Sequence, residues 1–252
     1  MAADGDLPDL IPGAHIAGAD LSAADWAERD LADLVLEDCA LVDVQVTATL
    51  LQGARFTRCR FVRCRFAHVD LREAVFEDCV MTDAEEHAGA AFAFCQLDEA
   101  RFARCDLSFS DFDRSSLYAV EMSDTNLVGA RFHRADFSRA FGKKVVRWAA
   151  AFRGCRMGLA DLSEASLPGC DLSGSSLREA DLTGADLEGA DLKGCDLFQA
   201  LTGGAKLARA DLRGAAIDGL ALTALSSFEG VKITGGQQHL LLAALGVDVL
   251  PE

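Results

Sequence analysis

A five-residue period runs through most of this 252-residue chain and restricts its fold more than any other feature. Between Leu159 and Ala200 a leucine stands at every fifth position, with a small residue two positions before it. These leucines are Leu162, Leu167, Leu172, Leu177, Leu182, Leu187, Leu192 and Leu197. A period of five matches neither the 3.6-residue repeat of an α-helix nor the two-residue alternation of a flat strand. It fits a four-sided coil in which each unit forms one side and about 20 residues complete a turn.

Within each unit, two positions are expected to point inward. They are the central Leu or Phe, called i below, and the small residue at i−2. The other three positions collect Asp, Arg, Glu, Gly and Ser, so they are expected to face solvent. Successive coils would then stack at the usual strand separation of about 4.8 Å. The result is a long, narrow core in which each central side chain contributes roughly 1.5–3 kcal/mol on burial.

Tandem units of Ala, then Asp or Asn, then Leu, then any two residues resemble those of the pentapeptide-repeat proteins. The matching triplets are Ala19–Asp20–Leu21, Ala180–Asp181–Leu182, Ala185–Asp186–Leu187, Ala190–Asp191–Leu192 and Ala210–Asp211–Leu212. The resemblance covers nearly the whole chain. It implies an all-β fold, the right-handed quadrilateral β-helix of a pentapeptide-repeat solenoid.

Two interruptions divide the repeat, which is expected to span residues 19–225 as one domain. The first lies near 82–91, because no central residue stands between Met81 and Phe92. The second lies near 140–150, where Gly and Arg replace central residues before the period resumes. Both are predicted to be loops extruded from a corner of the coil. For the first, a β-bulge that absorbs one residue is the alternative.

The two ends of the chain depart from the regular repeat. Residues 1–18 contain Pro8 and Pro12, and they are expected to form an irregular lead-in that covers the first coil, or else a frayed tail. Residues 226–252 are expected to hold a short helix over 237–245 with a glycine after it. A helix of this length is marginal alone. Its apolar side should therefore rest on the last coil or on a second copy of the chain.

The residue types that usually carry catalysis or metal binding follow the repeat instead. All nine cysteines stand at i−2, where they alternate with Ala, so they are predicted to be reduced core residues. The five histidines are scattered and have no partner at metal-ligand spacing. The sequence also lacks nucleophile–base pairs, zinc motifs and glycine-rich nucleotide loops. We therefore expect a protein that is not an enzyme, with no catalytic residues, no metal and no cofactor.

The chain is strongly acidic, with 40 Asp and Glu against 24 Lys and Arg and a formal net charge of −16. This charge argues against direct binding of nucleic acid or of an anionic membrane, and it favours a basic partner or serves solubility. No apolar run approaches the roughly 18 residues of a membrane span. A basic and apolar signal segment is also not seen at the start of the sequence. We expect a cytoplasmic protein.

Aspartates at the i−1 position are expected to stack where they recur at multiples of about 20 residues. Asp171, Asp191 and Asp211 form one such row, with Asp111 farther back on the same line, and Asp161 and Asp181 form a second row. Two charges about 5 Å apart in water repel by roughly 0.8 kcal/mol, and a cationic partner would relieve this repulsion. Alternatively, Asp simply suits the turn and keeps a β-rich rod soluble.

A closer resemblance comes from the segment Cys105–Phe137, the positions of both loops, and the ending Gly230–Pro251. Together they are similar to the Qnr, MfpA and AlbG group of pentapeptide-repeat proteins. The resemblance implies a homodimer, joined at its C-terminal end, that mimics DNA and binds DNA gyrase or topoisomerase IV. It also implies protection of these enzymes from quinolones or natural gyrase poisons, with the loops tuning protection. This chain departs from the group in its longer N-terminal part, which has several more repeats before Phe56.

Three sets of candidate residues follow. The loop residues expected to touch a partner are Asp83, Glu85, Glu86, His87, Lys143, Lys144, Arg147 and Trp148. The acidic rows supply Asp111, Asp161, Asp171, Asp181, Asp191 and Asp211. Dimerisation is assigned to Leu240, Leu241, Ala244, Leu245, Val247 and Val249. The alternative function is a non-catalytic structural or interaction module for an unrelated basic partner.

Overall fold

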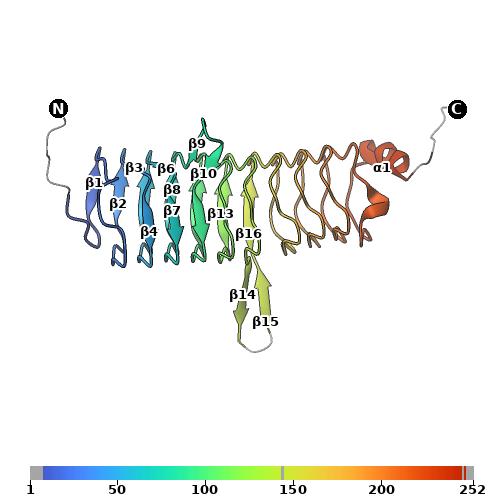
Figure 1. The fold of residues 1–252 in the computed structure, drawn as a ribbon. Helices are drawn as coiled ribbons and strands as arrows, with labels where there is room; N and C mark the ends of the chain where they lie inside the picture. The colour runs from blue at the N-terminus through green and yellow to red at the C-terminus, as the bar shows by residue number, and fades with distance from the viewer. Residues whose placement is uncertain (1–7, 143–144, 246, 248–252) are drawn as a thin grey trace.

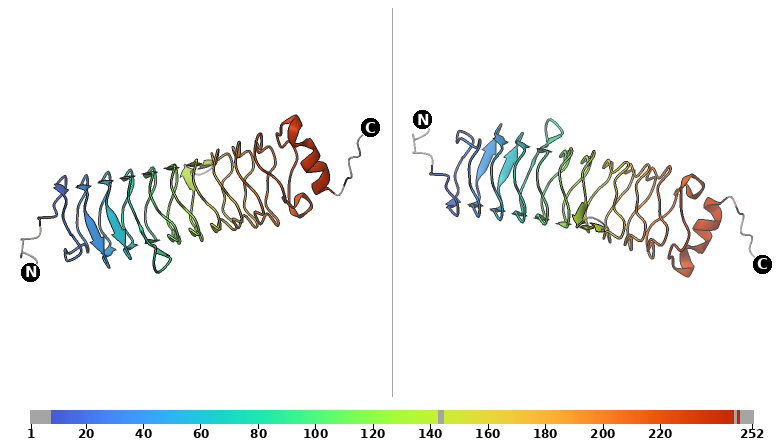
Figure 2. Two further views of the ribbon diagram at one scale, coloured as in Figure 1. Left: turned by 90° about the horizontal axis from the view of Figure 1, so that it is seen from above. Right: turned by 90° about the horizontal axis from the view of Figure 1, so that it is seen from below.

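The computed structural model describes residues 8–142, 145–245 and 247. They wind into a single rod of stacked coils, with the N-terminal end of the chain at one end of the rod and a short helix at the other (Figure 1). Views from above and below show the same elongated stack (Figure 2). The coils are four-sided and their neighbours pair in parallel. The expected right-handed quadrilateral β-helix is confirmed.

Parallel pairing between coils builds the four faces of the rod. Face 1 is a seven-stranded sheet, in the order β1 (His15–Ala17), β2 (Val35–Glu37), β5 (Arg55–Thr57), β8 (Val75–Glu77), β12 (Arg101–Ala103), β13 (Val120–Ser123) and β16 (Ala150–Arg153). Face 2 contains β3 (Ala40–Val42) and β6 (Arg60–Val62). Face 3 contains β4 (Gln45–Thr47), β7 (Arg65–Ala67) and β11 (Ala91–Ala93). Face 4 follows face 3 along the chain, and isolated bridges such as Asp30–Leu50 join its coils.

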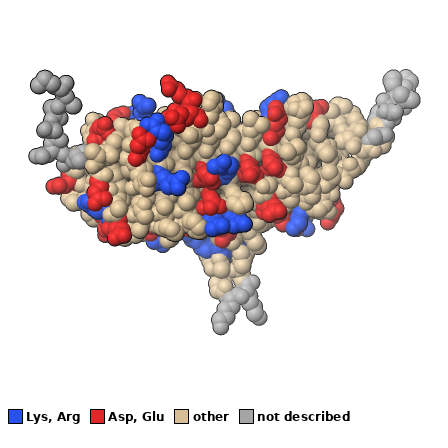
Figure 3. Space-filling view, viewed as in Figure 1, with Lys and Arg blue, Asp and Glu red and all other residues tan. Residues whose placement is uncertain are grey.

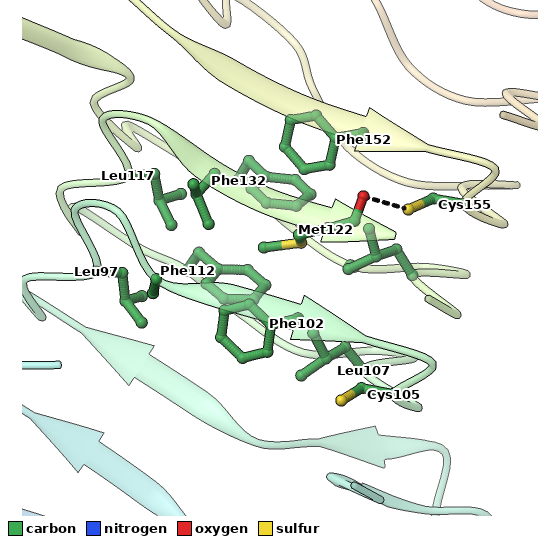
Figure 4. Packing of buried hydrophobic residues seen from close by; sticks show 14 of the residues in the cluster. Leu97, Phe102, Cys105, Leu107, Phe112, Leu117, Met122, Phe132, Phe152 and Cys155 are labelled. Atoms are coloured by element: carbon green, nitrogen blue, oxygen red, sulfur yellow. Dashed lines mark hydrogen bonds between the residues drawn. The ribbon is translucent and has the colours of Figure 1, made fainter. Parts of the chain in front are cut away.

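The interior is one continuous hydrophobic cluster, made by the central residues and their i−2 neighbours. Its phenylalanines form two ladders on opposite faces. Phe56, Phe76 and Phe102 on face 1 stack with ring centroids 4.6 Å apart. Phe66, Phe92, Phe112 and Phe132 on face 3 stack at 4.9–5.1 Å. The close-up in Figure 4 shows members of both ladders between the two faces. One amino-acid type at one repeat position thus fills this part of the core.

All nine cysteines are buried, as predicted. Six of them line one corner of the rod together with a threonine and a serine, in the order Cys39, Cys59, Cys79, Cys105, Thr125, Cys155, Ser175 and Cys195. Each side chain of this column lies within hydrogen-bond reach of the carbonyl of a face 1 central residue in the coil before it. Cys155 Sγ, for example, lies 3.3 Å from the carbonyl oxygen of Met122 (Figure 4). Burial raises the pKa of Cys155 to about 11, so its thiol keeps its proton at neutral pH.

Most corners of the rod pass through the left-handed backbone region at the i+2 position. The C-terminal coils often place glycine there, such as Gly184 with φ of 69°. The N-terminal coils use charged residues instead, such as Arg58 with φ of 53°. Asp at i−1 supports the same turn, because Asp181 Oδ1 accepts the backbone N–H of Thr183 at 2.9 Å. The repeated aspartates therefore have a structural role in addition to their charge.

The rod begins earlier than expected from the repeat. Ile16 of β1 is buried and pairs with Leu36, so residues 15–17 form a first side of the rod and are not part of an irregular lead-in. The period reaches back this far because Ile16 stands one repeat unit before Leu21, the first leucine of the pattern. Leu10 is buried against this coil and covers it, as expected of a cap. Residues 1–7 lie outside the described part of the chain.

The rod also continues beyond residue 225. A short 3₁₀ helix, η1 (Leu222–Ala224), takes the place of one side. After it, Ser227 bridges to Lys206 and Lys232 bridges to Asp211, whereas the regular step would pair these residues one position earlier. The last coil is therefore one residue longer than a regular one. The pairing of the rod therefore extends past residue 225, where the C-terminal segment was expected to begin.

The expected C-terminal helix is present. It consists of a 3₁₀ turn, η2 (Gly235–Gln237), followed by α1 (Gln238–Ala244). Gln237 is buried at the end of the rod, and its side-chain amide donates to the carbonyl oxygens of Leu212 at 2.7 Å and Ala215 at 2.9 Å. Its Oε1 accepts the N–H of Thr234 at 2.8 Å. One side chain thus satisfies backbone groups that a further coil would otherwise bind.

Both interruptions of the repeat are antiparallel β-hairpins, where loops were expected. The first pairs β9 (Thr82–Asp83) with β10 (Ala88–Gly89), and the second pairs β14 (Ser138–Phe141) with β15 (Val145–Trp148) (Figure 1).

Each hairpin is an insertion at a corner, between two regular sides of the rod. Phe66 pairs with Phe92, although the regular step would bring it to Glu86, so the first hairpin adds six positions. Arg131 bridges to Asp161, although the regular step would bring it to Ala151, so the second adds ten. The coil resumes undisturbed after each hairpin, which excludes the alternative of a one-residue bulge.

Truncation of a ladder ring should destabilise the whole rod. Phe102 is fully buried and stacks on Phe76, so Phe102→Ala should lower the free energy of unfolding by about 3–5 kcal/mol. Phe94 is 43% exposed, and Phe94→Ala should cost about 1 kcal/mol or less. Urea unfolding followed by circular dichroism measures both. Equal losses for the two variants would contradict the contribution assigned to the buried, stacked ring.

Candidate partner-binding surface

The hairpin β9–β10 is fixed to the rod by an arginine. Arg63 forms ion pairs with Asp43 at 2.6 Å and with Asp83 at 2.5 Å, so it joins the root of the hairpin to an earlier coil. Asp83 Oδ1 also accepts the backbone N–H groups of Glu85 and Glu86 at 3.1 and 3.3 Å. The predicted contact residue Asp83 is therefore a support of the turn. Glu85, Glu86 and His87 are exposed at its tip.

The return strand of this hairpin lies flat on the next coil. A Cβ on Gly89 would come within 2.3–2.5 Å of backbone atoms of Ser108, Phe109 and Ser110, so only glycine allows this approach. The ring of Phe109 then packs edge-on against His87, with centroids 5.6 Å apart. The hairpin is thereby held from two sides. It is a fixed projection with an acidic tip.

A hollow of about 520 Å³ lies between this hairpin and face 2. Its floor includes Val42, Val62 and Val80, at positions next to central residues where the repeat usually has polar side chains. Arg60 and Glu85 also line it. The hollow gives the first hairpin an apolar neighbour that was not predicted from the sequence.

The hairpin β14–β15 carries apolar and basic side chains that are open to solvent. Phe141, Val145, Val146 and Trp148 are 40–47% exposed, and Arg147 is exposed too. Arg147 lies over the ring of Phe141, with its Cζ atom 5.6 Å from the centroid. Of the predicted contact residues of this loop, Arg147 and Trp148 thus lie on β15. Lys143 and Lys144 fall outside the described residues.

The predicted acidic rows are partly correct. Bridges place Asp171 beside Asp191 and Asp191 beside Asp211 on face 1, and Asp161 beside Asp181 on face 3. Asp111 does not lie on the first row. The hairpin β14–β15 interrupts the count, so Asp111 leads through Arg131 to Asp161 and belongs to the second row. A constant spacing along the sequence fails across an insertion.

Basic side chains neutralise most of these rows. Three ion pairs cover the first row: Arg153 with Asp171 at 2.5 Å, Lys193 with Asp191 at 2.7 Å and Arg213 with Asp211 at 2.7 Å. In the second row Arg131 pairs with Asp111 at 2.7 Å. Asp161 and Asp181 form no ion pair with any described residue. Figure 3 shows the same pattern over one face, with acidic and basic side chains interspersed along the rod. The rows are weaker sources of negative potential than their sequence suggests.

A different group of acidic residues remains less neutralised. We call it the acidic edge; it comprises Asp30, Asp33, Asp70, Glu73, Asp98 and Glu99, on face 4 and at the corner that follows it. Asp30, Asp33 and Glu73 are exposed, and they have no ion-pair partner within the described residues. The N–H of Asp33 donates to the carbonyl oxygen of Gln52, and the N–H of Glu73 donates to that of Asp98. Each of these bonds joins one coil at the edge to the next coil.

The acidic edge leads along the rod to the root of the hairpin β14–β15. Glu99 and Asp98 form ion pairs with Arg139 of that hairpin, at 2.8 and 3.6 Å. This edge was not predicted, because Asp33, Glu73, Asp98 and Glu99 stand after the central leucine, whereas the predicted rows contain only Asp at i−1. The sequence feature that indicates the edge is the recurrence of acidic residues beside Leu31, Leu71 and Leu97.

The helix α1 lies on the end of the rod. Of the residues assigned to dimerisation, Leu240, Leu241 and Ala244 are partly buried against the core of the chain itself. Leu245 and Val247 are exposed, at 53% and 47%. Val249 lies outside the described residues. An association through this end would therefore use Leu245 and Val247 together with the solvent-exposed side of α1.

Two other kinds of feature are not found in the described part of the chain. Among these residues, no group of three or more His, Cys, Asp or Glu is arranged to hold a metal ion. Within the same ranges, the helices are all too short or too polar to cross a bilayer.

Family models match two segments of the chain. Pentapeptide repeats, in eight copies, match residues 155–194 and 190–223, and a pentapeptide repeat region matches residues 54–132. Together these segments cover more than half of the sequence. The chain belongs to the pentapeptide-repeat family. In a sequence comparison with curated proteins, no match was found.

Among solved structures, the rod is similar to QnrB1, described as a plasmid-mediated fluoroquinolone resistance protein. A trypsin-treated form of QnrB1 matches with a TM-score of 0.73 and 26% identity, over 82% of this chain and 99% of that one. Full-length QnrB1 matches with a TM-score of 0.67 and 24% identity, over 88% of this chain and 100% of that one. The match thus extends over the whole length of QnrB1.

The pairing of Asp211 with Arg213 should appear in the pH dependence of stability. The hydrogen bonds from Arg213 hold the pKa of Asp211 at about 2, below its ordinary value. A carboxyl whose pKa is lowered by folding stabilises the fold above its unfolded pKa of about 3.9, and that stabilisation is lost as the pH falls towards about 2. Arg213→Gln should therefore be less stable than the wild type at pH 6, and the difference should shrink between about pH 4 and pH 2. Urea unfolding across this range measures it; a constant difference would contradict the pairing.

Proposed function

We propose that this protein binds a type II topoisomerase, DNA gyrase or topoisomerase IV, and protects it from a quinolone or a natural gyrase poison. The observation that carries the proposal is the similarity to trypsin-treated QnrB1 over 99% of that chain, at 26% identity and a TM-score of 0.73. The features that differ from a plain rod, two hairpins and an acidic edge, are surface features suited to a protein partner.

The charge distribution supports a partner with a cationic groove. The acidic edge presents carboxylates on three of four neighbouring coils, and neither Asp33 nor Glu73 forms an ion pair within the described residues. Carboxylates held on a rigid frame lose little conformational entropy on binding, and desolvation near a basic surface strengthens their attraction. A rod with such an edge can occupy a groove built for the phosphates of DNA. The protein would then compete with DNA on the topoisomerase.

The hairpins would supply the contacts beside that groove. Hairpin β14–β15 exposes apolar side chains that include Val146 and Trp148, and aromatic anchors often dominate binding energy at interfaces. The exposed Leu245 and Val247 at the end of the rod would join two copies into a homodimer. We expect the protein to act in the cytoplasm, with the topoisomerase. The proposed action needs no catalytic group.

The direct test is a cleavage-complex assay. Purified type II topoisomerase is incubated with supercoiled DNA and a fluoroquinolone, and linear DNA is measured while this protein is titrated up to micromolar concentrations. The proposal expects a decrease in drug-stabilised cleavage at concentrations that leave supercoiling largely active. No effect on cleavage or on supercoiling would refute it and would favour an interaction module for another basic partner.

The acidic edge should matter more than total charge. The double variant Asp33→Lys and Glu73→Lys reverses two exposed acids of the edge. Because two charge pairs would change from attraction to repulsion, we expect at least about a ten-fold increase in the concentration needed for protection. The matched control Asp218→Lys and Glu229→Lys changes the net charge equally, at exposed positions near the other end of the rod. Equal losses in both variants would show that only net charge matters.

A further inference from the structure

The hairpin β14–β15 has two different faces. Side chains alternate along each strand, and the cross-strand pairs are Ser138–Trp148, Arg139–Arg147, Ala140–Val146 and Phe141–Val145. One face therefore carries Arg139, Phe141, Val145 and Arg147, and the other carries Ala140, Val146 and Trp148. Both faces contain apolar residues with more than a third of their surface exposed. Which face meets a partner depends on how the hairpin is held.

A hairpin of this kind does not hold its own orientation. Two strands without a third are marginally stable in water. Figure 1 shows that this hairpin projects away from the rod, so most of its length pairs with no coil. Contacts near its root must therefore set its direction. The face that carries Arg139 makes such contacts, and they all involve face 4 or the corner after it.

Arg139 joins the hairpin to three residues of the rod. Its Nη1 atom donates to Glu99 Oε1 at 2.8 Å, and its Nη2 atom lies 3.6 Å from Asp98 Oδ1. Its Cζ atom lies over the ring of Tyr118, 4.5 Å from the centroid. The Asp98 side chain is only 12% exposed and also accepts the hydroxyl of Ser116 at 2.8 Å. The guanidinium is thus held by charge, by hydrogen bonding and by stacking at once.

The contact continues outward along the same face of the hairpin. Tyr118 meets Phe141 edge-on, with centroids 5.9 Å apart, and Arg147 lies over Phe141. Arg139 and Arg147 are direct cross-strand neighbours, a pairing of like charges that by itself destabilises a hairpin. Asp98 and Glu99 offset this repulsion by drawing Arg139 towards the rod. The like-charge pair is therefore tolerated only while the hairpin keeps this orientation.

We propose that Arg139 is a positioning residue that clamps the hairpin β14–β15 to the acidic edge through Asp98, Glu99 and Tyr118. The clamp turns the face with Phe141 towards the rod and presents the opposite face, with Val146 and Trp148, to an apolar surface of the partner. The identity of that partner rests on the proposed function. The clamp itself does not, because it is a property of the free protein.

The orientation can be measured without any partner. The chain has two tryptophans, and Trp26 is buried in the rod, so Trp26→Phe leaves Trp148 as the single fluorescent reporter on the hairpin. In this background, the double variant Asp98→Asn and Glu99→Gln removes the charges that hold Arg139. We expect the fluorescence anisotropy of Trp148 to fall and its acrylamide quenching constant to rise about two-fold, since a freed hairpin moves on the nanosecond timescale.

Three further variants separate positioning from folding. Asp218→Asn with Glu229→Gln removes the same charges far from the hairpin and should leave both signals unchanged. Tyr118→Leu should loosen Trp148 without changing any charge. Arg139→Lys should keep only part of the anisotropy, because an ammonium group pairs with the acids but cannot stack on Tyr118 or form two parallel hydrogen bonds to a carboxylate. Circular dichroism and thermal unfolding check that the rod itself is intact in each variant.

The effect of the clamp on protection is measured with the cleavage-complex assay. Deletion of residues 139–148 restores the five-residue step from Phe137 to Phe152, so the rod can close without the hairpin. This deletion gives the full effect of losing the hairpin. For the Asp98→Asn and Glu99→Gln variant, the concentration required for protection should be about ten-fold higher than for the wild type. This loss should approach the loss that the deletion causes.

The outcomes distinguish the two proposals. Unchanged anisotropy and quenching in both the double variant and Tyr118→Leu would overturn the clamp, whatever the topoisomerase does. Loosened Trp148 with full protection would overturn the claim that the clamp presents the binding face. A wild-type protein without any effect on topoisomerase would refute the proposed function alone, and the fluorescence result would still decide the clamp.

Discussion

Every feature of this molecule depends on the hydrogen bonds that join each coil to the next. The N–H of Asp181 reaches the carbonyl of Ala160 at 2.9 Å in the coil before it, and the N–H of Leu182 reaches that of Leu201 at 2.8 Å in the coil after it. Because each coil repeats these bonds, equivalent residues take the same place on successive layers. Side chains of one kind then stack directly on one another. The backbone ladder converts a period in the sequence into columns in space.

Columns of identical side chains help when they are apolar and hinder when they are charged. Phenylalanines gain from stacking at 4.6 Å, as Phe76 and Phe102 do. Carboxylates at a similar spacing repel, so the chain alternates charges along some corners. Asp38 pairs with Arg58 at 2.7 Å, and Asp78 pairs with Arg104 at 2.8 Å on the same corner. The acidic edge is informative because Asp33 and Glu73 have no such partner within the described ranges.

The fold could be predicted from the sequence because one constraint acts at every repeat. The central residues, the buried cysteines, the C-terminal helix and the places where the period fails were all visible as spacing. The shapes of the interruptions were not, since the short pairing of Thr82–Asp83 with Ala88–Gly89 has no alternation long enough to indicate strands. The position of Asp111 failed for a related reason, because its row depends on how much of the chain a hairpin removes from the coil.

The candidate surface was less predictable than the fold. Sequence spacing places carboxylates in rows, but it does not show which cations turn towards them. Arg153 and Arg213 neutralise aspartates of the first row through side-chain conformations that spacing does not specify. Arg139 was similarly invisible, because its partners Asp98 and Glu99 lie far earlier in the sequence, outside the hairpin. Specificity here lies in long side chains that cross between coils.

The buried Gln237 has a consequence for how proteins of this shape change length during evolution. A stack of equal layers has no intrinsic end, because its last layer offers the same unpaired backbone groups as any other. Gln237 binds the carbonyls of Leu212 and Ala215 and thereby terminates growth at that point. Repeats can be duplicated earlier in the gene without leaving the C-terminal end of the rod uncapped, since Gln237 still caps whichever coil is last.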